Sequence, residues 1–404
     1  MGYTGAENQT ERGTTVARIK LALVGAGNMG SSHLKDLSKS SSFELVGIAD
    51  IDEAKLAAHN KAYDVKGFTD FNELFDKTGC EAVVIATPHY QHTTVAIEAF
   101  SRGMHVLTEK PVGVHVKDVE KMTTAYNEAK KKKPDLVYAA MFQQRTLGYW
   151  RKIKELISDG ELGKLVRTTW IITDWFRTQF YYDNGGWRAT WKGEGGGVLL
   201  NQCPHNLDLY QWLVGMPATV HGFASFGKYH RIEVEDEVTA YMEHADGMVG
   251  HFITTTGESP GTNRLEIVGE NGKLVFENGE LVFFRNRHSM VKQINESQKG
   301  FDKVENWKIT VPYSSHGESG HRIVLENFAD TINGTAELIA PAPEGVHSVG
   351  LSNAMLLSVA KKKPVSIPLD GDEFEAVLND LIKNSTFTKD ESDPGRAGDL
   401  SKSF

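Results

Sequence analysis

The stretch LALVGAGNMGSSH, residues 21–33, decides how the first part of this chain folds. Its apolar start is typical of a buried strand, and Gly25, Gly27 and Gly30 follow in the spacing Gly-x-Gly-x-x-Gly. Between a strand and a helix, glycines at this spacing let the backbone approach a pyrophosphate whose charge rests on the helix N-terminus. The same spacing also occurs in ordinary tight turns, so the residues that follow must decide between the two interpretations.

An acidic residue lies where a dinucleotide site needs one. Asp50 ends the next apolar segment, FELVGIAD, 20 residues beyond Gly30, where a carboxylate would meet the hydroxyls of a ribose. A carboxylate there repels the additional phosphate of NADP, and the neighbouring Ile51 has no charge to offset the repulsion. The sequence therefore favours NAD as the cofactor, and NADP stays as the less favoured alternative because Lys55 is close in sequence.

Two patterns of secondary structure divide the chain. Between 18 and 142, apolar segments alternate with helical ones, which predicts a doubly wound α/β Rossmann fold with a parallel sheet. From about 165 onward, strand-like segments are separated by Asp-Gly and Asn-Gly pairs, which accept the positive φ of hairpin turns. This pattern predicts an α+β domain with a large, mainly antiparallel open sheet, followed by helices at about 319–333 and 346–361. The three pairs are Asp246-Gly247, Asn271-Gly272 and Asn278-Gly279.

Domain boundaries follow from these patterns. We expect a polar arm over 1–16, the Rossmann domain over 17–145 and the α+β domain over 146–386. The final residues, 387–404, have almost nothing to bury and are expected to be disordered.

Composition argues against several classes of function. The net charge of −9 makes nucleic acid or an anionic membrane an improbable main partner, because both require clustered positive charge. No apolar run approaches the roughly 20 residues that span a membrane. The two cysteines, Cys80 and Cys203, match no metal-ligand spacing, so no metal site is expected. Together with a polar N-terminal segment, they favour a reducing cytoplasm.

A second stretch, GEGGGVLLNQCPHNLDLYQWLVG at 193–215, joins a glycine cluster to an amphipathic segment. Asn201, His205 and Asp208 follow one another there at spacings of four and three, among several leucines. Taken alone, a histidine in such a helix is more often structural than catalytic, so this spacing assigns no function without further features.

Aromatic residues are concentrated just before this stretch, where four of the seven tryptophans lie within 22 residues of one another. Aromatic faces pack against sugar rings, but they are equally common in cores and subunit interfaces. Tyr182, Trp187 and Arg188 are favoured as substrate contacts because they precede the glycine cluster. Gln143 and Arg145, just past the last strand of the parallel series, are further candidates.

The segment TPHYQHTTVAIEAFSRGMHVLTEKPV, residues 87–112, adds Thr87-Pro88, His92 and the tripeptide Glu109-Lys110-Pro111. Together with the glycine fingerprint and the glycine-rich segment that leads to His205, it makes the chain resemble the glucose–fructose oxidoreductase, inositol dehydrogenase and MocA family. The likeness extends from about residue 18 to 386.

The resemblance implies a chemistry. Members of this family oxidise a secondary alcohol of a sugar or cyclitol by passing hydride to a nicotinamide. Lys110 would orient the substrate hydroxyl and the nicotinamide, and His205 would be the acid–base residue. The family's aspartate four residues earlier is replaced here by Asn201, whereas the second acidic position is kept as Asp208. Family members assemble through the exposed face of the second-domain sheet, so a homodimer or homotetramer is expected.

The residue patterns and the resemblance together give two sets of expected contacts. The expected cofactor contacts are Gly25, Gly27, Asn28, Met29, Gly30, Asp50, Thr87, Pro88, His92, Glu109 and Lys110. The expected substrate contacts are Lys110, Gln143, Arg145, Tyr182, Trp187, Arg188, Asn201 and His205.

The asparagine bears on the proton affinity of His205. A carboxylate beside an imidazole favours its protonated form, whereas the amide of Asn201 can only orient it. His205 is therefore expected to be less basic than in the usual pattern, with Asp208 supplying part of the missing field. A helix that begins at Pro204 would place His205 at the positive dipole end and lower its pKa further. A helix that begins near Val198 would stack Asn201 and His205 one turn apart.

The leading hypothesis is an NAD-dependent sugar or inositol dehydrogenase. One alternative is a glycosidase that uses NAD transiently, oxidising a ring carbon to permit elimination and then restoring it. Another is a non-catalytic NAD-binding regulator, against which the retention of both Lys110 and His205 counts.

Overall fold

The computed structural model of the chain describes residues 17–314 and 319–389. The expected polar arm and the greater part of the expected disordered tail lie outside the described residues. Of the tail, 387–389 are described, and Lys389 donates a hydrogen bond to the backbone oxygen of Gly185. In the described ranges, no helix combines the length and hydropathy that a membrane crossing requires.

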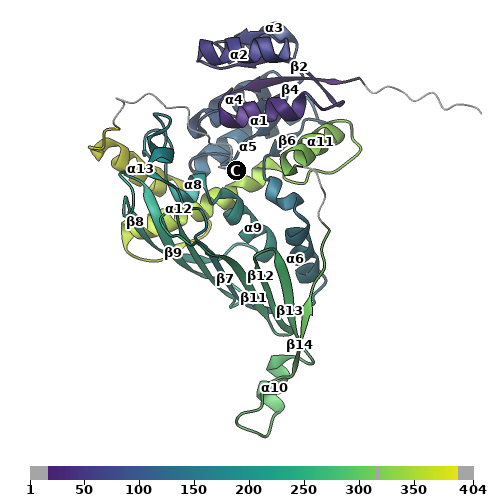
Figure 1. Cartoon of the computed structure of the whole chain (residues 1–404), viewed down its shortest axis with the longest axis vertical. Coiled ribbons are helices and arrows are strands. Elements are labelled where there is room, and N and C mark those ends of the chain that lie inside the picture. Colours follow the sequence, from purple (N-terminus) through teal and green to yellow (C-terminus); the bar gives the residue numbers. More distant parts are fainter. Residues whose placement is uncertain (1–16, 315–318, 390–404) are drawn as a thin grey trace, which may run out of the picture.

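The first unit, at the top of Figure 1, is built on a six-stranded parallel sheet. The strand order is β3-β2-β1-β4-β5-β6. Its strands are β1 (Ile19–Val24), β2 (Phe43–Ala49), β3 (Gly67–Phe68), β4 (Ala82–Ile85), β5 (His105–Thr108) and β6 (Tyr138–Ala140). Its helices are α1 (Asn28–Leu37), α2 (Glu53–Tyr63), α3 (Phe71–Thr78), α4 (His89–Ser101) and α5 (Val116–Lys130). The strand order reverses between β1 and β4, which opens a crevice at the carboxyl ends of the strands. The predicted Rossmann fold is confirmed.

The second unit is built on a nine-stranded sheet with the order β14-β13-β12-β11-β7-β10-β9-β8-β15. Its strands are β7 (Leu165–Ile172), β8 (Thr219–Phe226), β9 (Glu235–Glu243), β10 (Val249–Thr255), β11 (Asn263–Gly269), β12 (Gly272–Glu277), β13 (Glu280–Asn286), β14 (Asn306–Thr310) and β15 (Val365–Ser366). Only the β7–β10 pair among these neighbours is parallel, so the mainly antiparallel sheet is confirmed. Asn278 and Gly279, with φ of 51° and 76°, form the β12–β13 turn as their sequence predicts.

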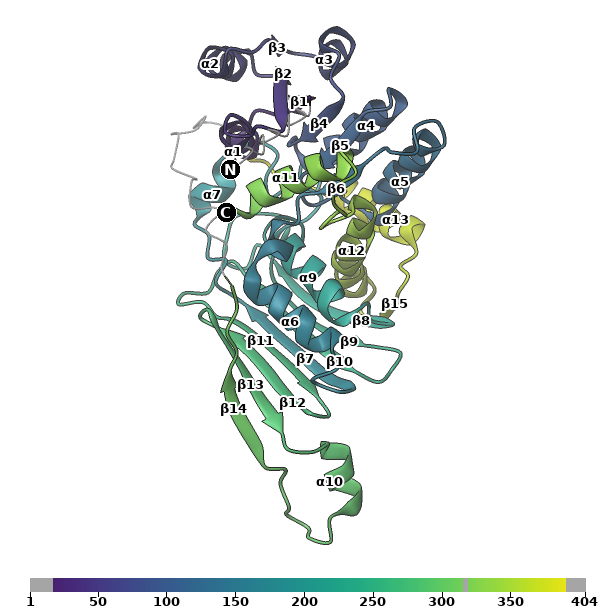
Figure 2. The ribbon, with the colours of Figure 1, turned by 90° about the vertical axis from the view of Figure 1, so that its right-hand side faces the viewer.

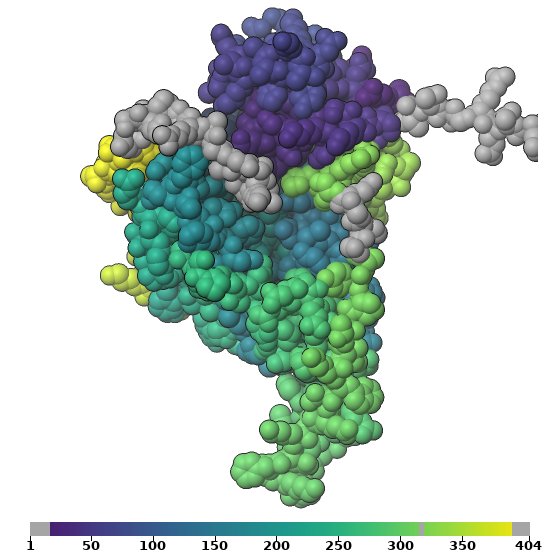
Figure 3. Space-filling view, in the orientation of Figure 1, coloured from purple at the N-terminus to yellow at the C-terminus, as the bar shows by residue number. Residues whose placement is uncertain are grey.

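The remaining helices are mostly placed around this sheet. They are α6 (Gly148–Ser158), α7 (Gln179–Asp183), α8 (Val198–Asn201), α9 (Pro204–Val214), α10 (Met290–Glu296), α11 (Gly320–Ile332), α12 (Gly345–Lys361) and α13 (Gly371–Asn384), with short 3-10 turns η1 (Gln143–Thr146) and η2 (Ala342–Glu344). Helices α6, α9 and α12 lie against one face of the sheet (Figure 2). The other face exposes Phe223 and Tyr241, and the segment around α10 projects beyond the body of the molecule (Figure 3).

Helix α11 differs from the expected domain division. It was expected within the second domain, but Val324, Leu325 and Phe328 pack into the core of the first sheet. The ring of Phe328 stacks on that of Phe43 in β2, with centroids 6.3 Å apart. Helical periodicity predicts the apolar face of α11 but not the sheet that this face will cover.

Helix α12 belongs to both units. Val349 packs into the core of the first unit, whereas Leu351 and Met355 pack into the core of the second. On the same helix, the amide of the buried Asn353 accepts from the Val116 backbone N–H and donates to the Val114 backbone oxygen, at 3.1 Å each. The helix therefore joins the two cores directly.

Candidate active site

The glycine loop between β1 and α1 has the shape of an anion cradle. Gly25 has a φ of +95°, and a Cβ there would lie 2.5 Å from the Ala86 carbonyl; a Cβ on Gly30 would lie 2.0 Å from the Gly25 oxygen. A Cβ on Gly27 would meet nothing within 4 Å, so open space lies in front of this residue. Helix α1 begins directly after it, with no side-chain cap and no acidic residue in its first turn. The backbone N–H groups at the start of α1, together with the open space at Gly27, fit the pyrophosphate of a dinucleotide.

The different surroundings of these glycines give a testable contrast. Gly27→Ala is expected to leave the free energy of unfolding nearly unchanged but to weaken NADH binding about tenfold or more, because the methyl group occupies the approach to the pyrophosphate. Gly25→Ala is expected to destabilise the fold by about 1–3 kcal/mol through strain and overlap with the backbone of Ala86. Urea unfolding and NADH fluorescence titration measure the two effects. Equal losses of stability in both variants would contradict this assignment.

Asp50 lies at the carboxyl end of β2, beside the same loop. Its carboxylate accepts from the Ala26 backbone N–H at 2.7 Å and from the Asp52 backbone N–H at 2.9 Å. The amine of Lys55 pairs with Asp52 and not with Asp50, and Ile51 is 91% exposed. The positive charge nearest in sequence is therefore already paired, which agrees with the preference for NAD inferred from the residues.

Glu109 and His92 hold the loops around this crevice. The buried Glu109 carboxylate lies 2.7 Å from Nε2 of His33 on α1. Burial alone would raise the pKa of Glu109, but the hydrogen bond and charge of His33 bring it to about 2. The two ring nitrogens of His92 each lie 2.9 Å from a backbone oxygen, one of Pro111 and the other of Thr87. Both side chains thus fasten loop backbone around the crevice.

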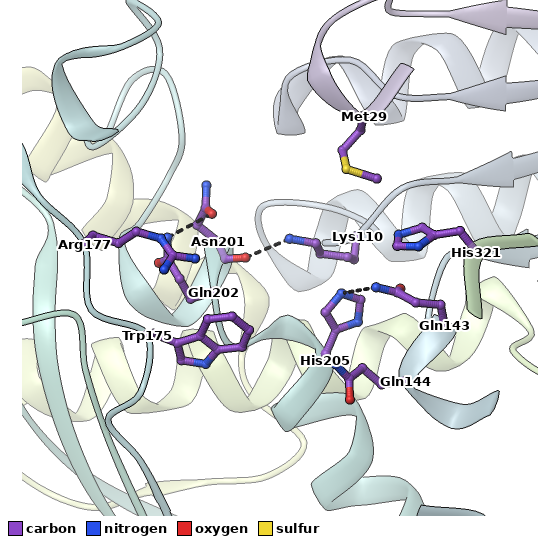
Figure 4. A pocket seen from close by; sticks show the side chains of 10 residues that line it. All are labelled: Met29, Lys110, Gln143, Gln144, Trp175, Arg177, Asn201, Gln202, His205 and His321. Carbon is purple, nitrogen blue, oxygen red and sulfur yellow. Dashed lines mark hydrogen bonds between the residues drawn. The ribbon is translucent and has the colours of Figure 1, made fainter. Parts of the chain in front are cut away.

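A pocket lies where the two units meet (Figure 4). Its lining includes Met29 in the first turn of α1 and Lys110 from the first unit, and Asn201 and His205 from the second. The other lining residues are Gln143, Gln144, Trp175, Arg177, Gln202 and His321. The structure therefore brings together Lys110, Asn201, His205 and Gln143, which the sequence analysis had placed in one site.

Lys110 follows β5 and reaches across to the second unit. Its Nζ donates to the backbone oxygen of Asn201 at 2.8 Å. Burial lowers the pKa of Lys110, and the positive charges of Arg188 and Arg177 lower it further. The ammonium group is thus held in the pocket with a fixed direction.

The structure has a short helix at each of the two possible starts: α8 begins at Val198, and the separate α9 begins at Pro204 with His205 in its first turn. Burial, and then the charge of Lys110, hold the pKa of His205 well below its usual range. The amide nitrogen of Gln143 lies 3.2 Å from its Nε2. Because an amide nitrogen only donates, Nε2 accepts this bond in the tautomer that carries its proton on Nδ1, and Gln143 occupies the single lone pair of Nε2.

Asp208 and Arg145 form an ion pair outside the pocket. Both side chains are almost fully buried, and the guanidinium makes two bonds to the carboxylate, at 2.6 and 2.8 Å. Arg145 also donates to Glu344 at 2.7 Å, and Gln211 donates to Asp208. These contacts correct two expectations: Asp208 is committed to Arg145 and not to His205, and Arg145 does not face the substrate position.

This pair predicts an effect on stability. Asp208→Ala is expected to lower the free energy of unfolding by about 3–5 kcal/mol, because it leaves the buried guanidinium of Arg145 without its main partner. Glu344→Gln, which changes the half-exposed partner, is expected to cost less than about 1 kcal/mol. Urea denaturation measures both variants, and an Asp208→Ala cost no larger than that of the control would show that the pair is dispensable.

The three favoured aromatic-segment contacts do not line the pocket. Tyr182 is buried, and its hydroxyl donates to Thr256. Trp187 packs edge-on against His89, and Arg188 donates to the hydroxyl of Tyr181. The core interpretation holds for Tyr182, whereas Trp187 and Arg188 are only partly buried. Arg188 is joined to the lining residue Asn201 through the hydroxyl of Tyr181.

Several pocket residues were missed by sequence reasoning. Trp175 and Arg177 lie in the aromatic segment but carry no spacing that separates them from their neighbours. Gln202 directly follows Asn201, so adjacency could have suggested it. His321, at the start of α11, has no motif around it, because only the tertiary return of α11 to the first unit brings it near.

Comparison with known proteins adds to this geometry. Residues 19–133 match the model described as "Oxidoreductase family, NAD-binding Rossmann fold", and 150–275 match the GFO/IDH/MocA C-terminal domain. The first unit is an NAD-binding Rossmann domain.

Two curated relatives cover part of the chain. The rhizopine catabolism protein MocA of Rhizobium meliloti is 28% identical over 212 residues, which are 50% of this chain and 60% of that protein. Inositol 2-dehydrogenase of Salmonella typhimurium is 29% identical over 149 residues, 36% of this chain and 43% of that enzyme. The matched part of this chain therefore spans less than two thirds of either relative.

A solved structure matches more of this chain. The WlbA dehydrogenase from Chromobacterium violaceum, in complex with NADH and UDP-GlcNAcA, is 28% identical with a TM-score of 0.75. The match covers 88% of this chain and 98% of that one. The likeness thus includes both units and the junction between them.

Proposed function

Because the chain belongs to the GFO/IDH/MocA oxidoreductase family, we propose that it oxidises a secondary hydroxyl of a sugar, sugar derivative or inositol by hydride transfer to NAD. The observation that carries this proposal is that Lys110 and His205, from different units, line one pocket together with Met29, which directly follows the glycine loop at the start of α1. Related proteins act on compounds of this class: one is an inositol 2-dehydrogenase, and another was crystallised with NADH and UDP-GlcNAcA.

The residues present fit the cofactor. The glycine loop, the uncapped start of α1 and Asp50 would hold NAD, and the buried Thr87 hydroxyl beside the loop has no protein partner among the described residues. When bound, NAD supplies the hydride acceptor.

The chain's own residues handle the proton and the developing charge. Nε2 of His205 takes the proton of the substrate hydroxyl once that hydroxyl replaces the Gln143 amide at its single lone pair, and its low pKa keeps the imidazole neutral beforehand. The ammonium of Lys110 stabilises the oxygen that loses this proton, by charge and by hydrogen bonding. Gln143 holds Nε2 as an acceptor until the substrate is bound. Burial of His205 and partial burial of Lys110 limit competing contacts with water.

The proposal is tested by following NADH absorbance with NAD and, separately, NADP across inositols, aldoses, sugar phosphates, nucleotide-linked uronic acids and glycosides. We expect net NADH production with at least one polyol or sugar, at a higher kcat/KM for NAD than for NADP. Cleavage of a glycoside without net NADH would instead indicate the glycosidase. No turnover of any compound with either cofactor would contradict the dehydrogenase and favour a regulator.

A further inference from the structure

A chain of four hydrogen-bonded side chains runs behind the pocket. Nη1 of Arg188 donates to the Tyr181 hydroxyl at 2.7 Å, which donates to Oδ1 of Asn201 at 2.8 Å. Nδ2 of Asn201 donates to Oε1 of Glu194. A guanidinium only donates and an ionised carboxylate only accepts, so the direction of every bond in the chain is fixed.

This direction settles what Asn201 offers to the pocket. Its Oδ1 also accepts from Nε2 of Gln202 at 3.1 Å, so both lone pairs of that oxygen are used. One N–H of its Nδ2 is used by Glu194. The remaining N–H is the group that Asn201, a lining residue, has for a ligand. Asn201 therefore has a donor and no acceptor left in its side chain for a ligand, where an aspartate would have only acceptors.

Glu194 is built into the loop that holds Asn201. Its side chain is buried, and Oε2 accepts from the Ala189 backbone N–H at 2.6 Å. Its backbone oxygen lies 3.2 Å from Nδ1 of His89. Burial raises the pKa of Glu194, whereas the charge of Arg188 lowers it. The acceptor geometry at both carboxylate oxygens matches the ionised form.

Other charged groups face this carboxyl from several elements. Lys389 near the end of the described chain attracts it, as Arg188 does. It also interacts with Lys110 after β5 and repels Glu235 on β9. Among the described residues, none of these charged groups is hydrogen-bonded to the Glu194 carboxylate, whereas the amide of Asn201 is.

We propose that Glu194 is a positioning residue, which holds Asn201 as a hydrogen-bond donor to the oxygen of the substrate hydroxyl. The inference rests on the proposed function and deepens it. A hydroxyl that gives its proton to His205 leaves its oxygen free to accept, and the Lys110 ammonium and the Asn201 N–H both donate. Two donors on that oxygen stabilise the charge that develops as the proton leaves.

A double-variant cycle separates this role from simple support of the fold. In Glu194→Gln, the new amide N–H faces one of the two N–H groups that the carboxylate accepts from, those of Asn201 and Ala189. In Asn201→Asp, two carboxylates come into contact. In the variant that combines both, an amide again faces a carboxylate, so the internal pairing is restored, but the pocket now meets an acceptor. Glu233→Gln is the matched control, since Glu233 accepts from the Trp191 backbone N–H of the same loop and touches no pocket residue that the structure describes.

Unfolding in urea and kcat/KM are measured for all variants, with the compound of the sugar and inositol panel that has the highest turnover. Each single variant is expected to lose about ten- to hundredfold in kcat/KM, and each is expected to be less stable than the unchanged protein. The combined variant is expected to recover stability but not kcat/KM. The control is expected to keep kcat/KM, and NADH affinity is expected to stay the same throughout.

Two results would overturn the proposal. Recovery of kcat/KM together with stability in the combined variant would show that the pocket does not need a donor at this position. Additive losses of stability would show that Glu194 and Asn201 do not act through one contact. If no panel compound is turned over, the proposed function fails separately, and the unfolding cycle still decides whether Glu194 holds Asn201.

Discussion

His205→Asn is expected to lower kcat by about 10²–10⁴-fold, with little change in NADH affinity. The reason is that Nε2 of His205 is the unprotonated ring nitrogen in the pocket, and an amide cannot take the proton of the substrate hydroxyl. Steady-state kinetics and NADH fluorescence titration measure the two quantities. The matched control is His244→Asn, which removes a half-buried histidine bonded to Tyr210 away from the pocket. A comparable loss in both variants would attribute the effect to packing.

The pH dependence follows from the same residue. Burial and the charge of Lys110 hold the pKa of His205 well below its usual range, so the imidazole stays neutral as the pH falls through about 6.5. The kcat/KM of the unchanged enzyme is therefore expected to stay constant across that range and to decline only at lower pH. A decline that is already complete near pH 6.5 would show that His205 is not the base or is not buried as described.

Lys110→Met is expected to lower kcat/KM by about 10²–10³-fold, because it removes the charged donor from the oxygen where negative charge develops. Part of the loss has a second origin: the bond from Nζ to the Asn201 backbone oxygen also joins the two units across the pocket. Lys154→Met controls for that loss, since Lys154 is partly buried and also donates to a backbone oxygen, that of Trp212, at 2.6 Å. Kinetics and urea unfolding of both variants measure the contrast.

The outcome for Lys110 has a clear alternative. If Lys110→Met and Lys154→Met lose the same stability and Lys110→Met keeps full activity, Lys110 is structural. Full activity in both variants would remove it from the proposed mechanism altogether.

The sequence predicts most of the fold because the signals that decide it are local. The glycine spacing after β1 and the alternation of strands with helices specify the first unit, and the Asn-Gly and Asp-Gly pairs specify hairpins of the second. The return of α11 to the first sheet could not be predicted in this way. Its apolar face is visible in the sequence, but which sheet it covers depends on packing between distant segments.

The site is predicted less completely, for a related reason. Lys110 and His205 were placed together by resemblance, and the structure brings both to one pocket. The pairing of Asp208 with Arg145 joins residues 63 positions apart, and no spacing rule anticipates it. Tyr182 and Trp175 have the same composition signal, yet only Trp175 lines the pocket. The facing direction of a side chain within an irregular segment is set by tertiary contacts alone.

The shared helix α12 has a mechanical consequence. Because it is packed in both cores, and because Asn353 is bonded to the backbone at Val114 and Val116, rotation of one half against the other must break these contacts. Swinging one half away from the other would expose apolar side chains of α12 and leave that amide without partners. We therefore expect the two halves to keep one arrangement when a ligand enters or leaves the pocket, so that any adjustment falls to side chains that line it, such as Trp175.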